Sequence, residues 1–435
     1  MSRLVFTIGA VILGICLVQL ANGFLGTLVS METSAAGFSP AVMGIVLASY
    51  FGGYTIGAVS VGRLLMRVGH IRMFAALAGL VAASVIVQPI LTSAPAWIFI
   101  RLATGFGCAG LFITAESWLN ASSTAKNRGA VFALYMVATN ACFGGGQFLL
   151  NLPAPMGFEL FALAAALFCL ALIPVSLTHA SPPVLPPAPS FGLRELRRLA
   201  PVSIAGCAAS GLASSAFYAL VPAYGQAQGV EASWISAYIA TAIFGGLAFQ
   251  VPVGKLSDRF DRRVVVACVA AGLSVMALVL ALLPQTMAIL VATFVLGGFL
   301  STIYPVAVAH ANDRVDPQHA VSVSGLLILV NGIASFVSPM IGTGIMGRAG
   351  FTGVFVYMAI VAGLFAFFAL WRARTVEQPE HKERPFVFLS ERMGHQSAHV
   401  ADDADTVDMQ EASFANDAGV AAPERETSSR CMSSQ

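Results

Sequence analysis

Two ionisable side chains that stand inside long apolar runs, Arg101 and Glu116, are the groups in this sequence best suited to chemistry. A charge inside a membrane-spanning segment is costly and marks a functional site by default. Arg101 either faces an internal cavity or reaches to the membrane surface from near the outer end of its run. Glu116 has two possible roles. It forms a structural ion pair with one of two arginines, Arg67 or Arg128, or it binds and releases protons during transport. About fifteen residues of helix would separate Arg101 from Glu116 by about 22 Å, so we do not expect them to pair.

Uncharged polar or small residues recur at helical spacing in two apolar runs. They are Gln19, Asn22 and Gly26 in the first run, and Asn140, Gly144, Gln147 and Asn151 in the fifth. Residues at these spacings lie along one face of a helix. Such a stripe either makes hydrogen bonds between helices or lines a polar path through the membrane.

The sequence carries no motif of the common catalytic or ATP-dependent classes. Its one Gly-Lys pair, Gly254-Lys255, is followed by leucine, so a phosphate-cradling Walker A loop is missing. It has no HExxH or GxSxG, and we expect all seven histidines to lie in loops, a linker or a tail. Six of the seven cysteines lie in apolar stretches, where they act as small hydrophobic residues. We therefore expect no enzyme, no catalytic residue, no cofactor and no metal site.

The elements that must position these groups follow from the composition. Hydrophobic residues make up 57% of the chain and charged residues 10%, against roughly 25% charged in soluble domains. Apolar runs of about twenty residues, the length that crosses a bilayer, recur twelve times. They fall near 5–29, 41–62, 73–91, 96–118, 129–151, 158–177, 201–224, 233–253, 264–283, 287–309, 321–343 and 352–371. The sequence predicts an all-α membrane protein with twelve transmembrane helices.

Basic residues are concentrated in alternate connections between these runs. Arg348 alone falls in the other set of connections. Because cytoplasmic loops are enriched in Lys and Arg, this bias predicts that both termini are cytoplasmic. The formal net charge of +2 provides no field for nucleic acid, so we expect no nucleic-acid partner.

The chain divides into two similar halves. A shift of 192 residues places Gly53 on Gly245, Arg67 on Arg259, and Asn120 on Asn312. We expect an N-terminal six-helix bundle at 1–177, a cytoplasmic linker at 178–200, a C-terminal six-helix bundle at 201–371 and a disordered cytoplasmic tail at 372–435. The linker is rich in proline at first and basic at its end, and the tail is polar with an acidic patch.

Several motifs are similar to those of the major facilitator superfamily. GRLLMRVGHIR (62–72) and GKLSDRFDRR (254–263) resemble its GxLxDRxGRR loop, although Met66 and Asp261 depart from that pattern. RLATGFGCAG (101–110) resembles the RxxxGxxxA signature of the fourth helix. Together with ES (116–117), NRG (127–129) and IYPVAVAHANDRVDPQHA (303–320), it resembles a YcaD-like bacterial branch whose substrate is unassigned.

The resemblance implies a secondary active transporter that moves a small solute by alternating access, with helices one, four, seven and ten around the path. The expected cavity residues are Gln19, Asn22, Arg101, Asn140, Gln147, Tyr218 and Tyr304. The expected cytoplasmic gate consists of Gly62, Arg67, Gly69, Glu116, Gly254, Asp258 and Arg259. The alternative for the gate arginines is that they only fix the topology.

The expected partners are a small-molecule substrate, membrane lipid and protons as the coupling ion, and we expect a monomer. Efflux driven by proton exchange is the preferred mode. The alternative is a transport-inactive membrane sensor or scaffold with the same fold, which the replacement of the motif's aspartate by Met66 favours.

Overall fold

The computed structural model describes residues 2–124, 127–153, 157–178, 191–283, 287–350 and 352–375. This part of the chain is helical and has no β-strand, and twelve of its helical segments are long and apolar enough to cross a membrane. In chain order the helices are α1 (Ser2–Ala35), α2 (Pro40–Val68), α3 (His70–Val87), α4 (Ala94–Ala121), α5 (Arg128–Gly146), η1 (Gln147–Asn151), α6 (Glu159–Leu170), α7 (Leu172–Ser176), α8 (Leu193–Leu199), α9 (Pro201–Ala227), α10 (Ala232–Arg259), α11 (Arg262–Leu282), α12 (Met287–Asn312), η2 (Pro317–His319), α13 (Ala320–Ala349) and α14 (Thr352–Thr375). The predicted all-α membrane fold with twelve spans is confirmed.

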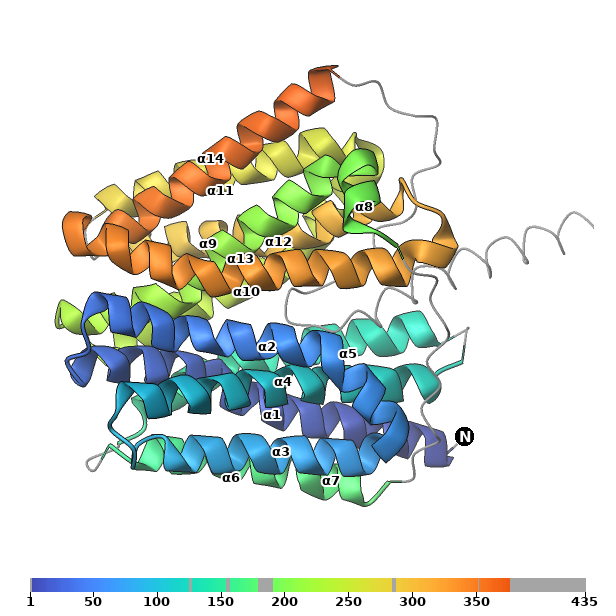
Figure 1. The fold of residues 1–435 in the computed structure, drawn as a ribbon, viewed down its shortest axis with the longest axis vertical. Coiled ribbons are helices and arrows are strands. Elements are labelled where there is room, and N and C mark those ends of the chain that lie inside the picture. The colour runs from blue at the N-terminus through green and yellow to red at the C-terminus, as the bar shows by residue number, and fades with distance from the viewer. Residues whose placement is uncertain are drawn as a thin grey trace, which may run out of the picture.

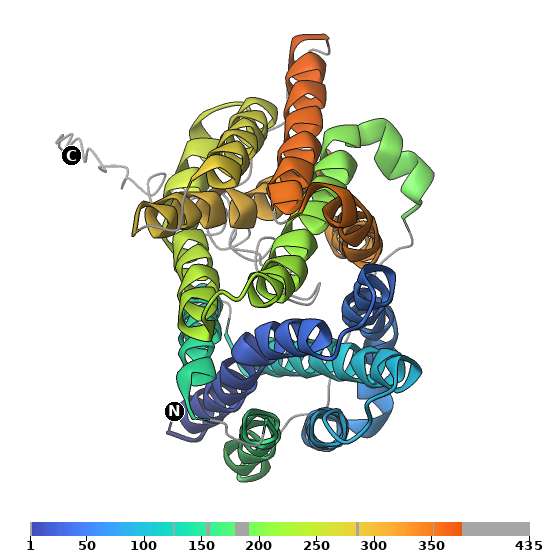
Figure 2. The same ribbon diagram turned by 90° about the vertical axis from the view of Figure 1, so that its left-hand side faces the viewer.

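The helices form two bundles. In Figure 1, α1 to α7 lie in the lower part of the molecule and α9 to α14 in the upper part, and Figure 2 shows the two groups from the end of the helices. Each bundle has its own apolar core, built around Phe74 and Phe112 in the first and Phe217 and Phe355 in the second. Large apolar side chains on the outer surface, such as Phe99 and Phe367, suit contact with lipid.

One end of the bundles, at the right of Figure 1, holds the start of α1, the helix α8 and most basic side chains. We call it the basic face; among its arginines are Arg67, Arg197, Arg263 and Arg314. The other end, the opposite face, holds the turns at 36–39, 88–93 and 228–231. The first part of the predicted linker, 179–190, and the predicted tail from 376 onward lie outside the described residues.

The helices run further than the apolar pattern indicates. α2 continues through the basic segment at 62–68, and α10 continues to Arg259, so most of both motif "loops" is helical. α2 ends at Gly69, whose φ of +84° favours glycine over any other residue. The expectation that no histidine lies in a helix is wrong, because His70 begins α3 and His310 lies in the last turn of α12. Hydropathy marks where a helix leaves the membrane, not where it ends.

Matching glycines bring matching helices together in the two bundles. A Cβ on Gly105 of α4 would overlap the backbone carbonyl oxygen of Tyr50 in α2. In the second bundle, 192 residues further on, a Cβ on Gly297 of α12 would overlap the carbonyl oxygen of Ala242 in α10. Small residues allow such close approach between membrane helices. In both halves, therefore, a glycine at the corresponding position allows the corresponding pair of helices to pack closely.

We expect Gly105→Ala to lower the free energy of unfolding by about 1–3 kcal/mol, the usual cost of overpacking, because the obstructing atom belongs to the backbone. The measurement is the thermal unfolding of the purified protein in detergent. The matched control is Gly79→Ala, at an exposed helical site with open space around the new Cβ. Equal stability of the two variants would contradict the close packing of α2 against α4.

Candidate functional site

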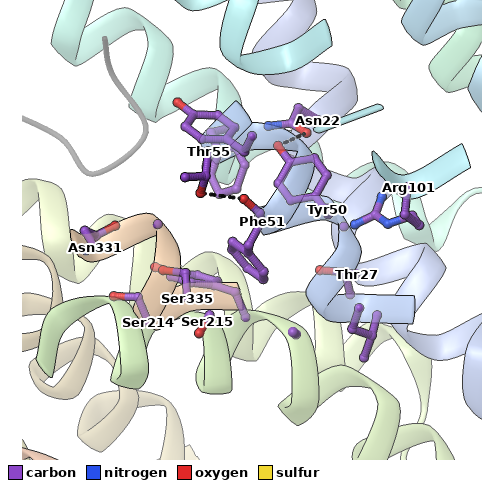
Figure 3. Close-up of a pocket in the computed structure, with 18 of the residues that line it drawn as sticks. Asn22, Thr27, Tyr50, Phe51, Thr55, Arg101, Ser214, Ser215, Asn331 and Ser335 are labelled. Atoms are coloured by element: carbon purple, nitrogen blue, oxygen red, sulfur yellow. Dashed lines mark hydrogen bonds between the residues drawn. The ribbon is translucent and has the colours of Figure 1, made fainter. Parts of the chain in front are cut away.

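A pocket lies between the two bundles, and its walls come from both of them. The first bundle contributes α1, α2, α4, α5 and η1, and the second contributes α9 and α13. The space measures about 1080 Å³ when the part open to solvent is counted. Its lining is mostly apolar and aromatic, with amides, hydroxyl groups and one guanidinium (Figure 3). A concave site of this composition suits a small organic molecule.

Arg101 supplies the one formal charge among the described residues of the pocket wall. The residue is 4% exposed, and its guanidinium lies over the ring of Tyr50, 4.6 Å from the ring centroid. The Tyr50 hydroxyl donates a hydrogen bond of 3.3 Å to Oδ1 of Asn22 in α1 (Figure 3). The Cys108 thiol, two turns of α4 beyond Arg101, lies 3.8 Å from the same oxygen. Three helices of the first bundle therefore hold the arginine in place.

Gln147 fixes α1 against the end of α5. Its Nε2 donates to the backbone carbonyl of Gly23 at 2.5 Å, and its Oε1 accepts from the Thr27 hydroxyl at 3.0 Å. α5 ends before this residue, and the tighter 3-10 helix η1 begins at it. Gln147 is 1% exposed, so its amide forms hydrogen bonds with buried polar groups of α1 as well as lining the pocket.

The second bundle contributes neutral polar groups that are already hydrogen-bonded. Asn331 of α13 donates to the carbonyl of Cys207 at 3.1 Å, and Ser335 donates to the carbonyl of Gly211 at 3.3 Å. Ser215 of α9 donates to the same carbonyl of Gly211 at 2.7 Å. The bonds of Asn331 and Ser335 hold α13 against α9, while that of Ser215 stays within α9, and all three leave a hydroxyl or amide oxygen as an acceptor for a ligand.

Four of the seven residues expected in the cavity line this one pocket: Asn22, Arg101, Gln147 and Tyr218. The other three lie elsewhere. Gln19 is buried in α1, Asn140 donates to the carbonyl of Met136 in its own helix, and Tyr304 packs in an apolar cluster that includes Leu327. Helical spacing alone does not separate a polar residue that faces a pocket from one that faces a neighbouring helix.

The contribution of α2 and α13 to the pocket was not predicted from the sequence. Tyr50 and Tyr54 of α2 stand four residues apart in the pocket wall, as do Asn331 and Ser335 of α13. This i, i+4 spacing is the signal that could have identified them, since such residues share a helix face. It was missed because the polar stripes considered came from the first and fifth helices.

Contacts between the bundles close the pocket toward the opposite face. The Ser30 hydroxyl of α1 donates to the carbonyl of Ala219 in α9, one turn beyond Thr27 of the pocket wall. Next to it, a Cβ on Gly44 of α2 would lie 2.5 Å from the Thr343 hydroxyl of α13. The Ser236 hydroxyl of α10 donates to Oδ1 of Asn151 at 3.2 Å. Three helix pairs therefore join the bundles on this side.

Among the expected gate residues of the second bundle, Asp258 makes an ion pair inside that bundle. Asp258 lies 3.2 Å from Arg262, and Arg262 lies 2.6 Å from Asp313 at the end of α12. Arg259 points outward and is exposed, and Gly254 is buried in α10. Asp258 thus ties α10 to α11 and, through Arg262, to the segment after α12.

The corresponding residues of the first bundle use different chemistry. Arg67 is exposed, Gly62 is half-buried, and Gly69 ends α2. His70 takes the place of Arg262; its ring stacks on Trp118 at 5.5 Å and lies 3.1 Å from the Ser117 hydroxyl. Glu116 is fully buried in α4, with the Tyr135 hydroxyl of α5 at 3.5 Å.

Twelve spans in two bundles around a central pocket define a multi-pass membrane protein of the transporter class. The family model of the Major Facilitator Superfamily matches residues 11–249 and 227–398. The chain belongs to this superfamily, as the motif resemblance predicted.

The similar proteins agree with this assignment. An uncharacterized MFS-type transporter of Enterobacter sp. (strain 638) is 30% identical over 373 residues, 83% of this chain and 94% of that protein. The uncharacterized MFS-type transporter YcaD of Escherichia coli O45:K1 (strain S88 / ExPEC) is 27% identical over 372 residues, 84% of this chain and 96% of that one. The resemblance to the YcaD-like branch is confirmed.

Solved structures of low sequence identity share the fold. The nucleoside transporter NupG matches with a TM-score of 0.65 and 16% identity, over 86% of this chain and 100% of that one. A bacterial homolog of the human lysosomal transporter Spinster, in an inward-facing and occupied conformation, matches with a TM-score of 0.67 and 14% identity, over 86% and 98%.

Proposed function

We propose that this membrane transporter exports a small solute by secondary active transport, with alternating access to the pocket between its bundles. The observation that carries the proposal is the placement of the pocket. Both bundles line it, and the contacts between α1 and α9 and between α2 and α13 described above cover it toward the opposite face. Rocking one bundle against the other would separate these contacts and open the pocket on that side.

We propose that the basic face is cytoplasmic and that the protein lies in the inner membrane of a bacterium. The concentration of arginines at this face supports the orientation, because cytoplasmic loops are enriched in basic residues. The start of α1 and the end of α14 would then both be cytoplasmic.

We expect Ala36→Cys and Gln228→Cys to react with an impermeant thiol reagent added to intact cells, and Leu193→Cys to react only after the cells are opened. All three positions are exposed, and the first two lie at the opposite face while Leu193 lies at the basic face. A background without the seven native cysteines removes competing reactions. Labelling of Leu193→Cys in intact cells would reverse the orientation.

Protons are the proposed coupling ion, with Glu116 as the group that takes them up. Glu116 is fully buried near Tyr135, and a buried intramembrane carboxylate is a natural proton carrier. The gate residues Gly62, Arg67, Gly69, Gly254, Asp258 and Arg259 would control opening at the cytoplasmic side.

The test is solute flux in proteoliposomes with and without an imposed pH gradient. For Glu116→Gln, which keeps the volume but cannot ionise, we expect the pH gradient to lose its effect while exchange of labelled for unlabelled solute continues. Glu231→Gln, at an exposed turn, is the matched control. A Glu116→Gln protein that still responds to the gradient contradicts this role, and one that fails to fold supports the structural ion pair.

A transport-inactive sensor or scaffold is the second candidate. The observation in its favour is Met66, an exposed apolar residue at the position that corresponds to Asp258 in the second bundle. Wild-type protein that binds a solute in the pocket but shows neither net flux nor exchange would establish this alternative.

A further inference from the structure

The pocket contains a cation with no protein counter-charge. Nε of Arg101 is buried and has no hydrogen-bond partner among the described residues. Among the described residues that line the pocket there is no aspartate or glutamate. A buried charge that lacks a partner is expensive, roughly 2.5–3.5 kcal/mol for an arginine at the centre of a membrane helix. The pocket therefore favours a ligand that brings a negative charge.

The neighbours of Arg101 orient it without neutralising it. The ring face of Tyr50, 4.6 Å from the guanidinium carbon, attracts a cation but adds no formal charge. The Tyr50 hydroxyl is directed to Asn22. A planar guanidinium held in this way offers its remaining N–H groups as a fork, which matches the two oxygens of a carboxylate.

The rest of the pocket wall determines which kind of molecule fits beside Arg101. Tyr54 and Phe112 form an aromatic pair with ring centroids 6.5 Å apart, and Phe51 and Phe143 add further apolar surface. Across the pocket from Arg101, Ser214 and Ser335 present hydroxyl groups (Figure 3). Such a wall suits a ligand with an aromatic or apolar body and one polar end, because one charged group anchors it and the remaining surface is largely apolar.

We propose that the pocket binds organic monoanions, carboxylates with an aromatic or apolar body, whose charged group is held by Arg101. This inference names the substrate class of the transporter and rests on the proposed function. The proposed direction is consistent with it, since a membrane potential that is negative inside drives one negative charge outward by about 2.3 kcal/mol per 100 mV.

The experiment compares acids with their neutral amides on the purified full-length protein in detergent. The probes are benzoate, phenylacetate and cinnamate, each paired with its primary amide, at constant sodium chloride. Binding to the folded state raises the unfolding temperature by an amount that grows with the logarithm of ligand concentration once that exceeds Kd. We expect at least one carboxylate to raise it and its amide to bind at least about tenfold more weakly, because the amide lacks the charge that Arg101 recognises.

Two variants assign the effect to Arg101. Arg101→Gln should lose the response to the carboxylate, and Arg374→Gln, which removes a charge at the far end of α14, should retain it. The acid–amide comparison on the wild-type protein decides the matter even if Arg101→Gln does not fold. Three results each overturn the proposal: no carboxylate binds, acid and amide bind equally, or Arg101→Gln keeps the full response.

The outcomes also separate this inference from the transport proposal. Flux of a neutral solute in vesicles, without any stabilisation by a carboxylate, would refute the proposed substrate class but would support the transport proposal. Carboxylate binding that depends on Arg101, without any flux, would support the site and refute transport. A response to chloride alone, measured in a sulfate buffer, would identify an inorganic anion site and overturn the organic class.

Discussion

Arg101→Ala should reduce solute flux at sub-saturating concentration at least about 30-fold, because removal of a buried charged partner costs about 2–5 kcal/mol of binding. The guanidinium is 4% exposed and lines the pocket, so water cannot replace it fully. Arg101→Lys keeps the charge but loses the planar fork and the stacking on Tyr50, so it should restore only part of the flux.

The stability of these variants separates binding from folding. Because Arg101 is buried without a carboxylate partner in the pocket wall, Arg101→Ala should not lower the unfolding temperature of the solute-free protein. Arg374→Ala serves as the control for loss of a basic residue. Flux is normalised to folded protein in each case. Wild-type flux from Arg101→Lys, together with near-normal flux from Arg101→Ala, would remove Arg101 from the site.

A disulfide between positions 44 and 343 should abolish flux, and a reductant should restore it. A Cβ at Gly44 would lie 2.5 Å from the Thr343 hydroxyl, so cysteine side chains at the two positions come within reach of each other. The double variant Gly44→Cys/Thr343→Cys joins α2 to α13 at the opposite face and would hold the two bundles together there. The single variants, treated with the same oxidant, are the controls. Full flux in the oxidised double variant would contradict alternating access at this face.

The sequence predicts the twelve helices well because a bilayer imposes a long apolar run on each of them. It predicts the helix ends poorly. α2 and α10 continue beyond the membrane into the basic segments at 62–68 and 254–259, where hydropathy falls but helix propensity does not. Gly69 was recognised as part of a motif, yet its role in ending α2 depends on a backbone angle that composition does not reveal.

Part of the site was predicted because some of its side chains are charged or carry an amide, which is unusual inside an apolar helix. Arg101 stands out by charge alone, and Asn22 and Gln147 stand out as amides in apolar helices. Whether Arg101 reaches the surface or the pocket depends on Tyr50 of another helix, so sequence leaves both options open. Asn140 and Gln19 carry the same signal as Asn22 but lie outside the pocket, since helix rotation in the bundle decides which face is inward.

The central claim is that one pocket between the bundles opens to each side of the membrane in turn. The most direct test measures from which side a residue of the pocket can be labelled. Ser214→Cys is placed in the Gly44→Cys/Thr343→Cys protein without native cysteines, with Ser214→Cys alone as the control. An impermeant thiol reagent is added to one side of reconstituted vesicles. Labelling is read at position 214 by peptide mapping, because reduction also frees the thiols at 44 and 343. We predict labelling of this position from both sides after reduction, and only from the basic face after oxidation. Labelling from the opposite face in the oxidised protein, or no labelling from that face after reduction, would contradict the account.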